Sequence, residues 1–373
     1  MPCVAKGLNY INDQMILLFD PDPPLLRWCK VDDGNAAEHK CEFDSAWNKN
    51  VLGTIGDARK IKGVGYVLYH GGPEINKPAI PLTPISLLDI ENSIQYLPEH
   101  NDMIVKVARE WIVRLTNIPH TVVCDTAFFI NMPNEASAYA VPVELRRKGI
   151  RRYGGYGLCH QWVWEKSQSL HLNRCEKIIS IYLGDHTNVA AIKNGRPVEM
   201  SIGFTPAEGI LSSNGCGDID PTIVFQLISA GMSLEEINKA LSREAGFTGL
   251  LDRPCSFLDL VGELDDAQVN DVREIFLYAV RKYIGSFIAI LGGVDAIAFV
   301  TKHPELSMNL QLDILGSFEF LGIKGKKVTD PRADYTILTE IDSPIVGVCY
   351  HYDKWKVINE RVNQVRRNGN ETR

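Results

Sequence analysis

Short apolar runs and helical patterns alternate along most of this chain. Four of these runs, apolar or β-branched and bounded by turn-forming residues, predict strands at 64–69, 121–124, 177–184 and 295–300. The dipeptide Asn194-Gly195 lies between two further strand-like segments and predicts a tight hairpin, because both residues tolerate positive φ. The second half of the chain should therefore contain a β-hairpin.

Helical patterns separate these strands. Apolar residues recur on one helical face in 101–116 and again in the long stretch 265–291, which Gly292 is expected to end. The sequence Ser233-Leu-Glu-Glu236 is a capping box, the N-terminal signal of another helix. Strands that alternate with helices predict an α/β protein.

The length and the charge of the chain narrow the possibilities further. Its 373 residues suggest two domains, and we place the first over 1–150 and the second over 151–373. A net charge of −7 argues against a nucleic-acid surface, which needs a basic excess. The basic segment 354–373 also contains acidic residues, so we expect a solvated helix with a frayed tail.

Cysteine usage and hydropathy bear on location. No apolar run reaches the length of about 18 residues that a membrane helix needs, and the N-terminus lacks a signal-peptide layout. The nine cysteines show no paired spacing, which favours reduced thiols over disulfides or a zinc site. We therefore expect a cytoplasmic protein without a membrane partner.

The most informative segment is Met200-Ser-Ile-Gly-Phe-Thr-Pro-Ala-Glu-Gly209, followed by Gly217-Asp-Ile-Asp-Pro221. It closely resembles the signature of the acetate kinase family, a branch of the actin and sugar-kinase superfamily. Further matching segments are His70-Gly71-Gly72, Pro98-Glu99-His100-Asn101, Asp125-Thr126-Ala127-Phe128, Arg151-Arg152-Tyr153-Gly154 and Gly292-Gly293-Val294-Asp295-Ala296. The resemblance extends from about Val4 to the C-terminus.

The resemblance implies an α/β fold of two ribonuclease-H-like (actin-like ATPase) domains around a cleft. It also implies a reaction between ATP and acetate or another short carboxylate that yields an acyl phosphate and ADP, with Mg²⁺ as cofactor. Family members pair through the second domain, so the resemblance raises the possibility of a homodimer.

Three residues match the family's catalytic positions. Asp125 ends an apolar strand and matches the active-site aspartate and possible metal ligand, although an aspartate after a strand often only caps a turn. His100 and His160 match family histidines near the substrate. For each of these histidines the alternative is a packed, hydrogen-bonded side chain without contact to a ligand.

The positive charges of the family site are largely substituted. Val67 stands at one family arginine, Gly215 at the signature arginine, and Tyr156 at the histidine that stabilises the transferring phosphoryl group. A tyrosine donates a hydrogen bond but supplies no positive charge at neutral pH. Phosphoryl transfer depends on such charges, so these changes predict weak catalysis.

The nucleotide side also departs from the family. The residues that match its phosphate loop are Tyr182, Leu183, Gly184, Asp185 and His186. The carboxylate of Asp185 stands where phosphates should approach. A second glycine loop is replaced by 302–306, where Pro304 has no N–H to present. A late metal-binding glutamate corresponds approximately to Ser343.

The start of the chain is the last departure. Val4-Ala5-Lys6-Gly7-Leu8 corresponds to a segment that lies further inside the family pattern. On this alignment the opening strand and its Asn-x-Gly-Ser-Ser-Ser turn are absent, so we expect a first domain that lacks its opening strand.

Two functional hypotheses follow. The first is an acetate kinase-like protein with a degenerate site, impaired in catalysis and kept as a binding or regulatory protein, with doubtful retention of ATP and Mg²⁺. The second is an active carboxylate phosphotransferase with an altered substrate or phosphoryl donor, in which Lys302, His303, Arg151 or Arg152 supplies charge. The alternative for the two arginines is a solvated loop pair.

Overall fold

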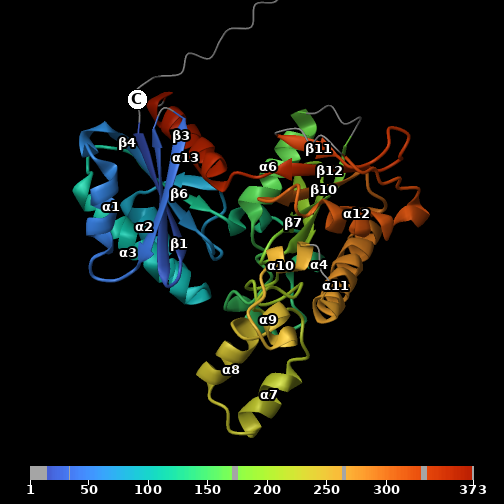
Figure 1. The fold of residues 1–373 in the computed structure, drawn as a ribbon. Helices are drawn as coiled ribbons and strands as arrows, with labels where there is room; N and C mark the ends of the chain where they lie inside the picture. Colours follow the sequence, from blue (N-terminus) through green and yellow to red (C-terminus); the bar gives the residue numbers. More distant parts are fainter. Residues whose placement is uncertain (1–14, 33, 170–174, 263–265, 329–333, 372–373) are drawn as a thin grey trace, which may run out of the picture. The chain divides into compact units, whose positions relative to one another are not determined.

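A computed structural model describes residues 15–32, 34–169, 175–262, 266–328 and 334–371. The chain forms two compact units (Figure 1). The first unit comprises Met1–Asp125 and Lys354–Arg373, and the second comprises Thr126–Asp353. No helix in the described part of the chain is long and apolar enough to span a bilayer.

The first unit is built on a six-stranded sheet in the order β3-β2-β1-β4-β6-β5. Its strands are β1 (Met15–Asp22), β2 (Leu25–Asp32), β3 (Asn35–Glu42), β4 (Ile61–Leu68), β5 (Ala79–Pro81) and β6 (His120–Cys124). The central strands β1, β4 and β6 are parallel, and the outer pairs are antiparallel. The predicted strands near 64–69 and 121–124 are confirmed as β4 and β6.

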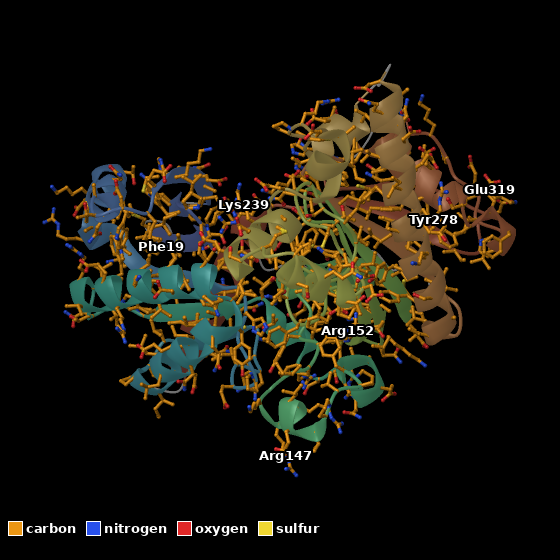
Figure 2. The ribbon with its side chains drawn as sticks, turned by 90° about the horizontal axis from the view of Figure 1, so that it is seen from below. Phe19, Arg147, Arg152, Lys239, Tyr278 and Glu319 are labelled. Carbon is orange, nitrogen blue, oxygen red and sulfur yellow. The ribbon has the colours of Figure 1, made fainter. Side chains whose placement is uncertain are left out.

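Both faces of this sheet are covered, which explains the unbroken apolar runs. On one face, Phe19 (labelled in Figure 2) stacks on Tyr66 with ring centroids 5.9 Å apart and lies 5.4 Å from Trp111 of helix α3 (Pro98–Arg114). On the other face lies α13 (Lys354–Glu371), shown in red against the blue strands in Figure 1. Val362 of α13 approaches Gly65 so closely that a Cβ there would lie 2.6 Å from its Cγ2.

The expectation that the first domain lacks its opening strand is wrong for the described residues. β1 occupies the centre of the sheet, parallel to β4 and antiparallel to β2. Its apolar residues from Met15 to Phe19 are all buried. The proline-rich turn that follows obscured this strand in the sequence. The segment Val4–Leu8, on which the expectation rested, lies outside the described residues.

The second unit contains another six-stranded sheet, in the order β11-β12-β10-β7-β8-β9. Its strands are β7 (Lys177–Leu183), β8 (Asn188–Lys193), β9 (Arg196–Met200), β10 (Ala296–Thr301), β11 (Tyr335–Ile337) and β12 (Val346–His351). The pattern of parallel and antiparallel pairs repeats that of the first sheet. The predicted hairpin is confirmed, because Asn194 and Gly195 have φ of 51° and 78°.

Helix α11 (Ala267–Leu291) supplies much of the second core. Phe276 packs edge-on against Phe247, with ring centroids 5.5 Å apart, and close to Phe257. The helix ends at Gly292, which adopts the left-handed conformation with φ of 64°, as predicted. The capping box at Ser233 is also confirmed, at the start of α8 (Leu234–Ser242).

The remaining helices belong to one or the other unit. In the first unit these are α1 (Trp47–Ile55) and α2 (Pro84–Asn92). In the second unit they are α4 (Asn134–Ser137), α5 (Val143–Arg147), α6 (Gly157–Ser169), α7 (Thr222–Ser229), α9 (Gly246–Leu251), α10 (Phe257–Val261) and α12 (Met308–Gly316).

The compact units divide the chain at other residues than the predicted boundary near 150. Residues 126–150 belong to the second unit, where α4 packs on β9, and the chain returns to the first unit at Lys354. The predicted C-terminal helix forms as α13, but the expectation that it is solvated is wrong. α13 packs on β4 and β6 and buries four apolar side chains there: Trp355, Val357, Ile358 and Val362.

Candidate functional site

The carboxyl edge of the first sheet gathers charged and aromatic side chains. Asp20 lies near the carboxyl end of β1, Tyr69 directly follows β4, and Asp125 directly follows β6. Because these three strands are neighbours and parallel, their ends meet at one edge. Ligands of open α/β sheets bind at that edge, so it is the first candidate site.

Asp20 is fully buried and is the centre of what we call the Asp20 cluster: Asp20, Arg27, Tyr69 and Lys354. Lys354 Nζ donates to both carboxylate oxygens of Asp20, at 2.9 and 2.8 Å, and to Tyr69 Oη at 2.7 Å. Arg27 Nη2 lies 2.8 Å from Asp20 Oδ2. Burial alone would raise the pKa of Asp20, but the charges of Lys354 and Arg27 hold that pKa below its usual value.

Two predicted site residues lie beside this cluster. Asp125 is buried, and its backbone N–H donates to Leu68 O at 2.9 Å. Burial and then the charge of Asp20, with a contribution from Asp125, raise the pKa of Tyr69 well above its usual value. His100 lies in the first turn of α3 with its ring edge 5.3 Å from the Tyr69 ring, and burial lowers its pKa. Asp125 at the end of β6 and His100 on α3 therefore both lie near Tyr69.

His160 does not belong to that group. It lies on α6 of the second unit and is fully buried. Its Nδ1 is 2.8 Å from Ser180 Oγ and its Nε2 is 2.7 Å from Asn188 Oδ1. Burial lowers the pKa of His160 to about 4. With both ring nitrogens engaged inside the unit, the geometry favours the packed, hydrogen-bonded alternative for this histidine.

The three substituted positions offer no positive charge. Val67 is fully buried within β4. Tyr156 has a positive φ of 57°, and its ring lies 4.7 Å from that of Tyr182. Gly215 donates its backbone N–H to Ser212 Oγ at 2.8 Å, and a Cβ at Gly215 would lie only 2.8 Å from the same oxygen.

The loop after β7 makes hydrogen bonds within itself and to two neighbouring segments. Gly184 N–H donates to Thr187 Oγ1 at 3.2 Å. The exposed carboxylate of Asp185 accepts from Ser213 Oγ at 2.6 Å and from the backbone N–H of Phe257 at 2.8 Å. The backbone N–H of Ser213 donates to Asp185 O at 2.9 Å. Asp185 therefore engages donors that an external anion at this loop would need.

Leu183 and His186 of the predicted nucleotide loop make contacts within the second unit. Leu183 is buried, and the carbonyl of His186 accepts from Asn188 Nδ2 at 2.8 Å. In the second loop, the backbone N–H of His303 donates to Thr301 Oγ1 at 3.1 Å.

Ser343, the approximate match of the late metal-binding glutamate, lies in a turn of the second unit. Its hydroxyl donates to Ile345 O at 2.7 Å and accepts from the backbone N–H of Lys324 at 3.3 Å. A hydroxyl engaged in this way holds its own turn.

The alternative of a solvated Arg151-Arg152 pair is wrong for Arg152. Its Nη1 lies 3.1 Å from Glu199 Oε1, its Nη2 donates to Met200 O at 2.6 Å, and its Nε lies 3.5 Å from Glu208 Oε1 (Arg152 is labelled in Figure 2). Glu208 also accepts from the Tyr139 hydroxyl. Arg152 therefore holds the signature segment in place and is not a free cation.

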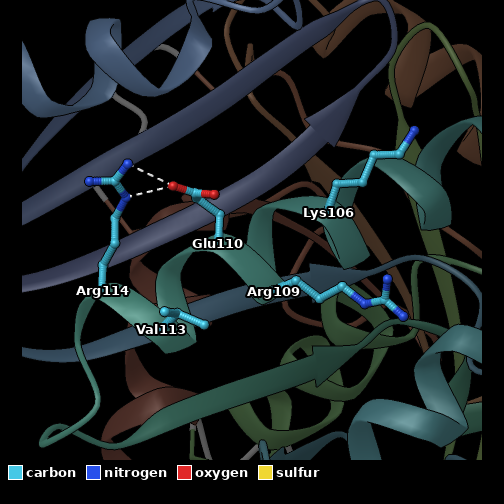
Figure 3. A pocket seen from close by; sticks show the side chains of 5 residues that line it. All are labelled: Lys106, Arg109, Glu110, Val113 and Arg114. Carbon is cyan, nitrogen blue, oxygen red and sulfur yellow. Dashed lines mark hydrogen bonds and ion pairs between the residues drawn. The ribbon is translucent and has the colours of Figure 1, made fainter.

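A hollow on the surface of α3 is a weaker candidate (Figure 3). Its lining residues are Lys106, Arg109, Glu110, Val113 and Arg114. Its cations pair with carboxylates at 2.6 to 2.8 Å: Lys106 with Asp102, Arg109 with Glu91, and Arg114 with Glu110. The hollow lies along the C-terminal half of α3, whereas His100 and the carboxyl edge lie at the other end of the helix. Its neutralised charge gives a ligand little to bind.

Sequence reasoning missed Asp20, Arg27, Tyr69 and Lys354. Asp20 had a usable signal, because it follows the apolar run 15–19 as Asp125 follows its own strand. Lys354 had none, since it lies 334 residues away along the chain.

Comparisons with known proteins identify the family to which the chain is similar. The Acetokinase family profile matches residues 31–358. Acetate kinase of Halothermothrix orenii is 33% identical over 278 residues, covering 73% of this chain and 70% of the relative. Acetate kinase of Coprothermobacter proteolyticus is 32% identical over 330 residues, covering 85% of this chain and 82% of the relative.

Solved structures show the same fold. Porphyromonas gingivalis acetate kinase superposes with a TM-score of 0.82 at 23% identity, covering 94% of this chain and 99% of that one. A propionate kinase from Francisella tularensis superposes with a TM-score of 0.83 at 21% identity, covering 94% and 100% of the two chains. The two-domain α/β architecture is thereby confirmed.

Proposed function

Because this chain belongs to the acetate kinase family, we propose that it is an acetate kinase-like protein whose phosphoryl transfer is impaired. The family reaction converts ATP and acetate, or another short carboxylate, into an acyl phosphate and ADP. In this chain the retained site residues serve binding or regulation. A nucleotide and a small carboxylate are the ligands that its ancestry suggests.

The observation that carries the proposal is the position of Asp185. Its carboxylate already accepts from Ser213 Oγ and from the N–H of Phe257. A nucleotide phosphate approaching this loop would meet a negative charge and would have to displace both hydrogen bonds. Gly184, the one glycine kept in the loop, has its N–H engaged by Thr187.

The loss of cations supports the same conclusion. Val67, Tyr156 and Gly215 cannot neutralise the charge that develops on a transferring phosphoryl group. Removing one preorganised stabiliser typically costs roughly two to three orders of magnitude in rate. Such effects need not add, but the loss of three leaves little of the family rate.

The alternative of an active phosphotransferase with relocated charges finds less support. Arg152 is held by Glu199 and Glu208, and the cations Arg27 and Lys354 are both bound to Asp20. None of these groups is presented to a ligand in the way that a catalytic arginine would be.

The test is a hydroxamate assay for acyl phosphate on the full chain, run beside an active family member. We expect a rate lower by at least roughly three orders of magnitude. Family-like rates with ATP and acetate would overturn the proposal. The same assay with other nucleotides and pyrophosphate as donors tests the alternative, which predicts acyl phosphate formation with at least one donor.

A single substitution tests the role of Asp185. Asp185→Ala frees Ser213 Oγ and the N–H of Phe257, so ATP should bind roughly tenfold tighter than to the wild type. Asp271→Ala removes the same charge from the exposed face of α11 and should leave affinity unchanged. Equal affinities in all three proteins would contradict the blocking role.

Self-association through the second unit belongs to the same proposal. Large apolar side chains are exposed on α7 and α11, among them Phe225 and Tyr278 at 65% exposure each (Tyr278 is labelled in Figure 2). Faces of this kind often mark contacts between subunits. Sedimentation equilibrium that finds only monomer would remove this part of the proposal.

The cysteines support the cytoplasmic part. Those that the structure describes are all free thiols. This state fits a reducing compartment.

A further inference from the structure

We infer that the first unit holds no divalent metal at its carboxyl edge, because the ammonium group of Lys354 takes the place of that metal at Asp20. The inference deepens the proposed function by naming the counter-ion of this site. It can hold or fail independently of whether phosphoryl transfer is impaired.

The family reaction implies Mg²⁺, and the first sheet has one place where its ligands would be sought. Mg²⁺ prefers carboxylate oxygens at about 2.1 Å and usually bridges them to substrate phosphates. Asp20 and Asp125 lie at the carboxyl edge of neighbouring parallel strands, and Asp22 lies close by, with Oδ2 3.5 Å from Arg27 Nε.

The residues at this edge do not fit a metal ion. Lys354 Nζ contacts both oxygens of Asp20, and Arg27 Nη2 contacts one of them at 2.8 Å. A divalent ion bound to the same oxygens would lie beside two positive groups, inside a site where Asp20 is fully buried. Among the described residues, no group of three or more His, Cys, Asp or Glu side chains is arranged to hold a metal.

Lys354 competes well with a dissolved cation for Asp20 because the fold holds its side chain at the site. It is the first residue of α13, and Trp355, Val357 and Ile358 directly after it are buried in the first unit. Its ammonium also lies 4.8 Å from the centroid of the Tyr69 ring, a cation–π contact. A tethered cation acts at a high effective concentration and does not depend on the metal concentration of the solution.

The direct test is a titration of the wild-type protein with Mn²⁺, in which free Mn²⁺ is followed by electron paramagnetic resonance. We expect no stoichiometric binding in the wild type. One tightly bound Mn²⁺ per chain that Asp20→Asn removes would overturn the inference. This measurement needs no variant of Lys354 and decides the question even if such a variant fails to fold.

A variant of Lys354 tests whether the ammonium group is what keeps the metal away from Asp20. Lys354→Met frees Asp20 Oδ1 and leaves Oδ2 with Arg27 alone, so Mn²⁺ should bind at least about tenfold tighter than to the wild type and should raise the Tm of this variant alone. Lys106→Met is the matched control, because it removes a lysine whose partner Asp102 is on the exposed surface of α3. A folded Lys354→Met protein without any gain in Mn²⁺ affinity would contradict the inference.

An assay in EDTA separates this inference from the proposed function. Acyl phosphate formation at family-like rates in EDTA would overturn the impairment and support the tethered cation. An inactive protein that binds one Mn²⁺ through Asp20 would support the impairment and overturn the tethered cation.

Discussion

His160 shows how a single buried residue connects stability to pH. The side chain is fully buried between Ser180 and Asn188, and burial lowers its pKa to about 4. The Asn188 amide is oriented by its own bond to His186 O, so Oδ1 accepts and His160 Nε2 donates. His160 is therefore a neutral side chain whose two hydrogen bonds link α6 to the second sheet.

The lowered pKa of buried His160 predicts that the protein loses stability in acid. The pKa of His160 is lower in the folded state than the ordinary value of 6.5, so the native state excludes the charged form. The contribution of neutral His160 to the free energy of unfolding is complete above pH 6.5. It should decline by roughly 3 kcal/mol as the pH falls toward 4. Urea unfolding at several pH values measures this decline. The variant His160→Gln should have a flatter profile, and identical slopes would count against this account.

At the scale of elements, the loop 212–215, which joins the two parts of the signature segment, depends on a close backbone contact. The chain around Gly246 lies against residues 212–215, with Phe247 N–H donating to Ser212 O at 3.0 Å. Gly246 has φ of 61°, and a Cβ there would lie 2.0 Å from Ser212 O. Position 246 therefore needs glycine for two separate reasons, the positive φ and the lack of space.

Two glycine substitutions separate these reasons. Gly231 also has a positive φ, of 95°, but a Cβ there would meet nothing within 4 Å. Gly231→Ala should cost about 1–2 kcal/mol from backbone strain alone. Gly246→Ala should cost about 1–3 kcal/mol more, because the added methyl also clashes. Denaturant midpoints give both values, and equal costs would show that the segment moves aside.

Elements set by local signals were predictable. The turn at Asn194-Gly195, the capping box at Ser233 and the end of α11 at Gly292 each depend on a few neighbouring residues. β1 was missed because its apolar run is short and runs into prolines, and the alignment of Val4–Leu8 directed attention elsewhere. Asp125 and His100 were placed usefully, whereas the partners of Asp20 come from distant parts of the chain that no local pattern connects.

At the scale of the whole molecule, the two sheets share one strand order although the sequence shows no repeat. Strand order follows from which strands pair through backbone hydrogen bonds and from the need to cover the apolar faces of the sheet, and many different side chains satisfy these requirements. The division into units was hidden for a related reason. α13 completes the first unit from the far end of the chain, and its apolar face matches a sheet that lies more than two hundred residues earlier.

Removal of α13 should therefore affect the two units unequally. Four of its apolar side chains are buried, and each contributes about 1.5–3 kcal/mol, against a total of about 5–15 kcal/mol for a typical domain. In a chain that ends at Asp353, hydrogen exchange should become fast in β4 and β6 and stay slow in β7 and β10. Unchanged protection in β4 would show that the helix is dispensable.

The late position of α13 also has a consequence during synthesis. The ribosome makes every strand of the first sheet before it makes Lys354, so the second unit is complete while one face of that sheet is still bare. The apolar surface of β4 and β6 must be shielded from other nascent chains throughout this interval. The order of translation thus makes the first unit the last to mature, and we expect it to depend more than the second on chaperones in the cell.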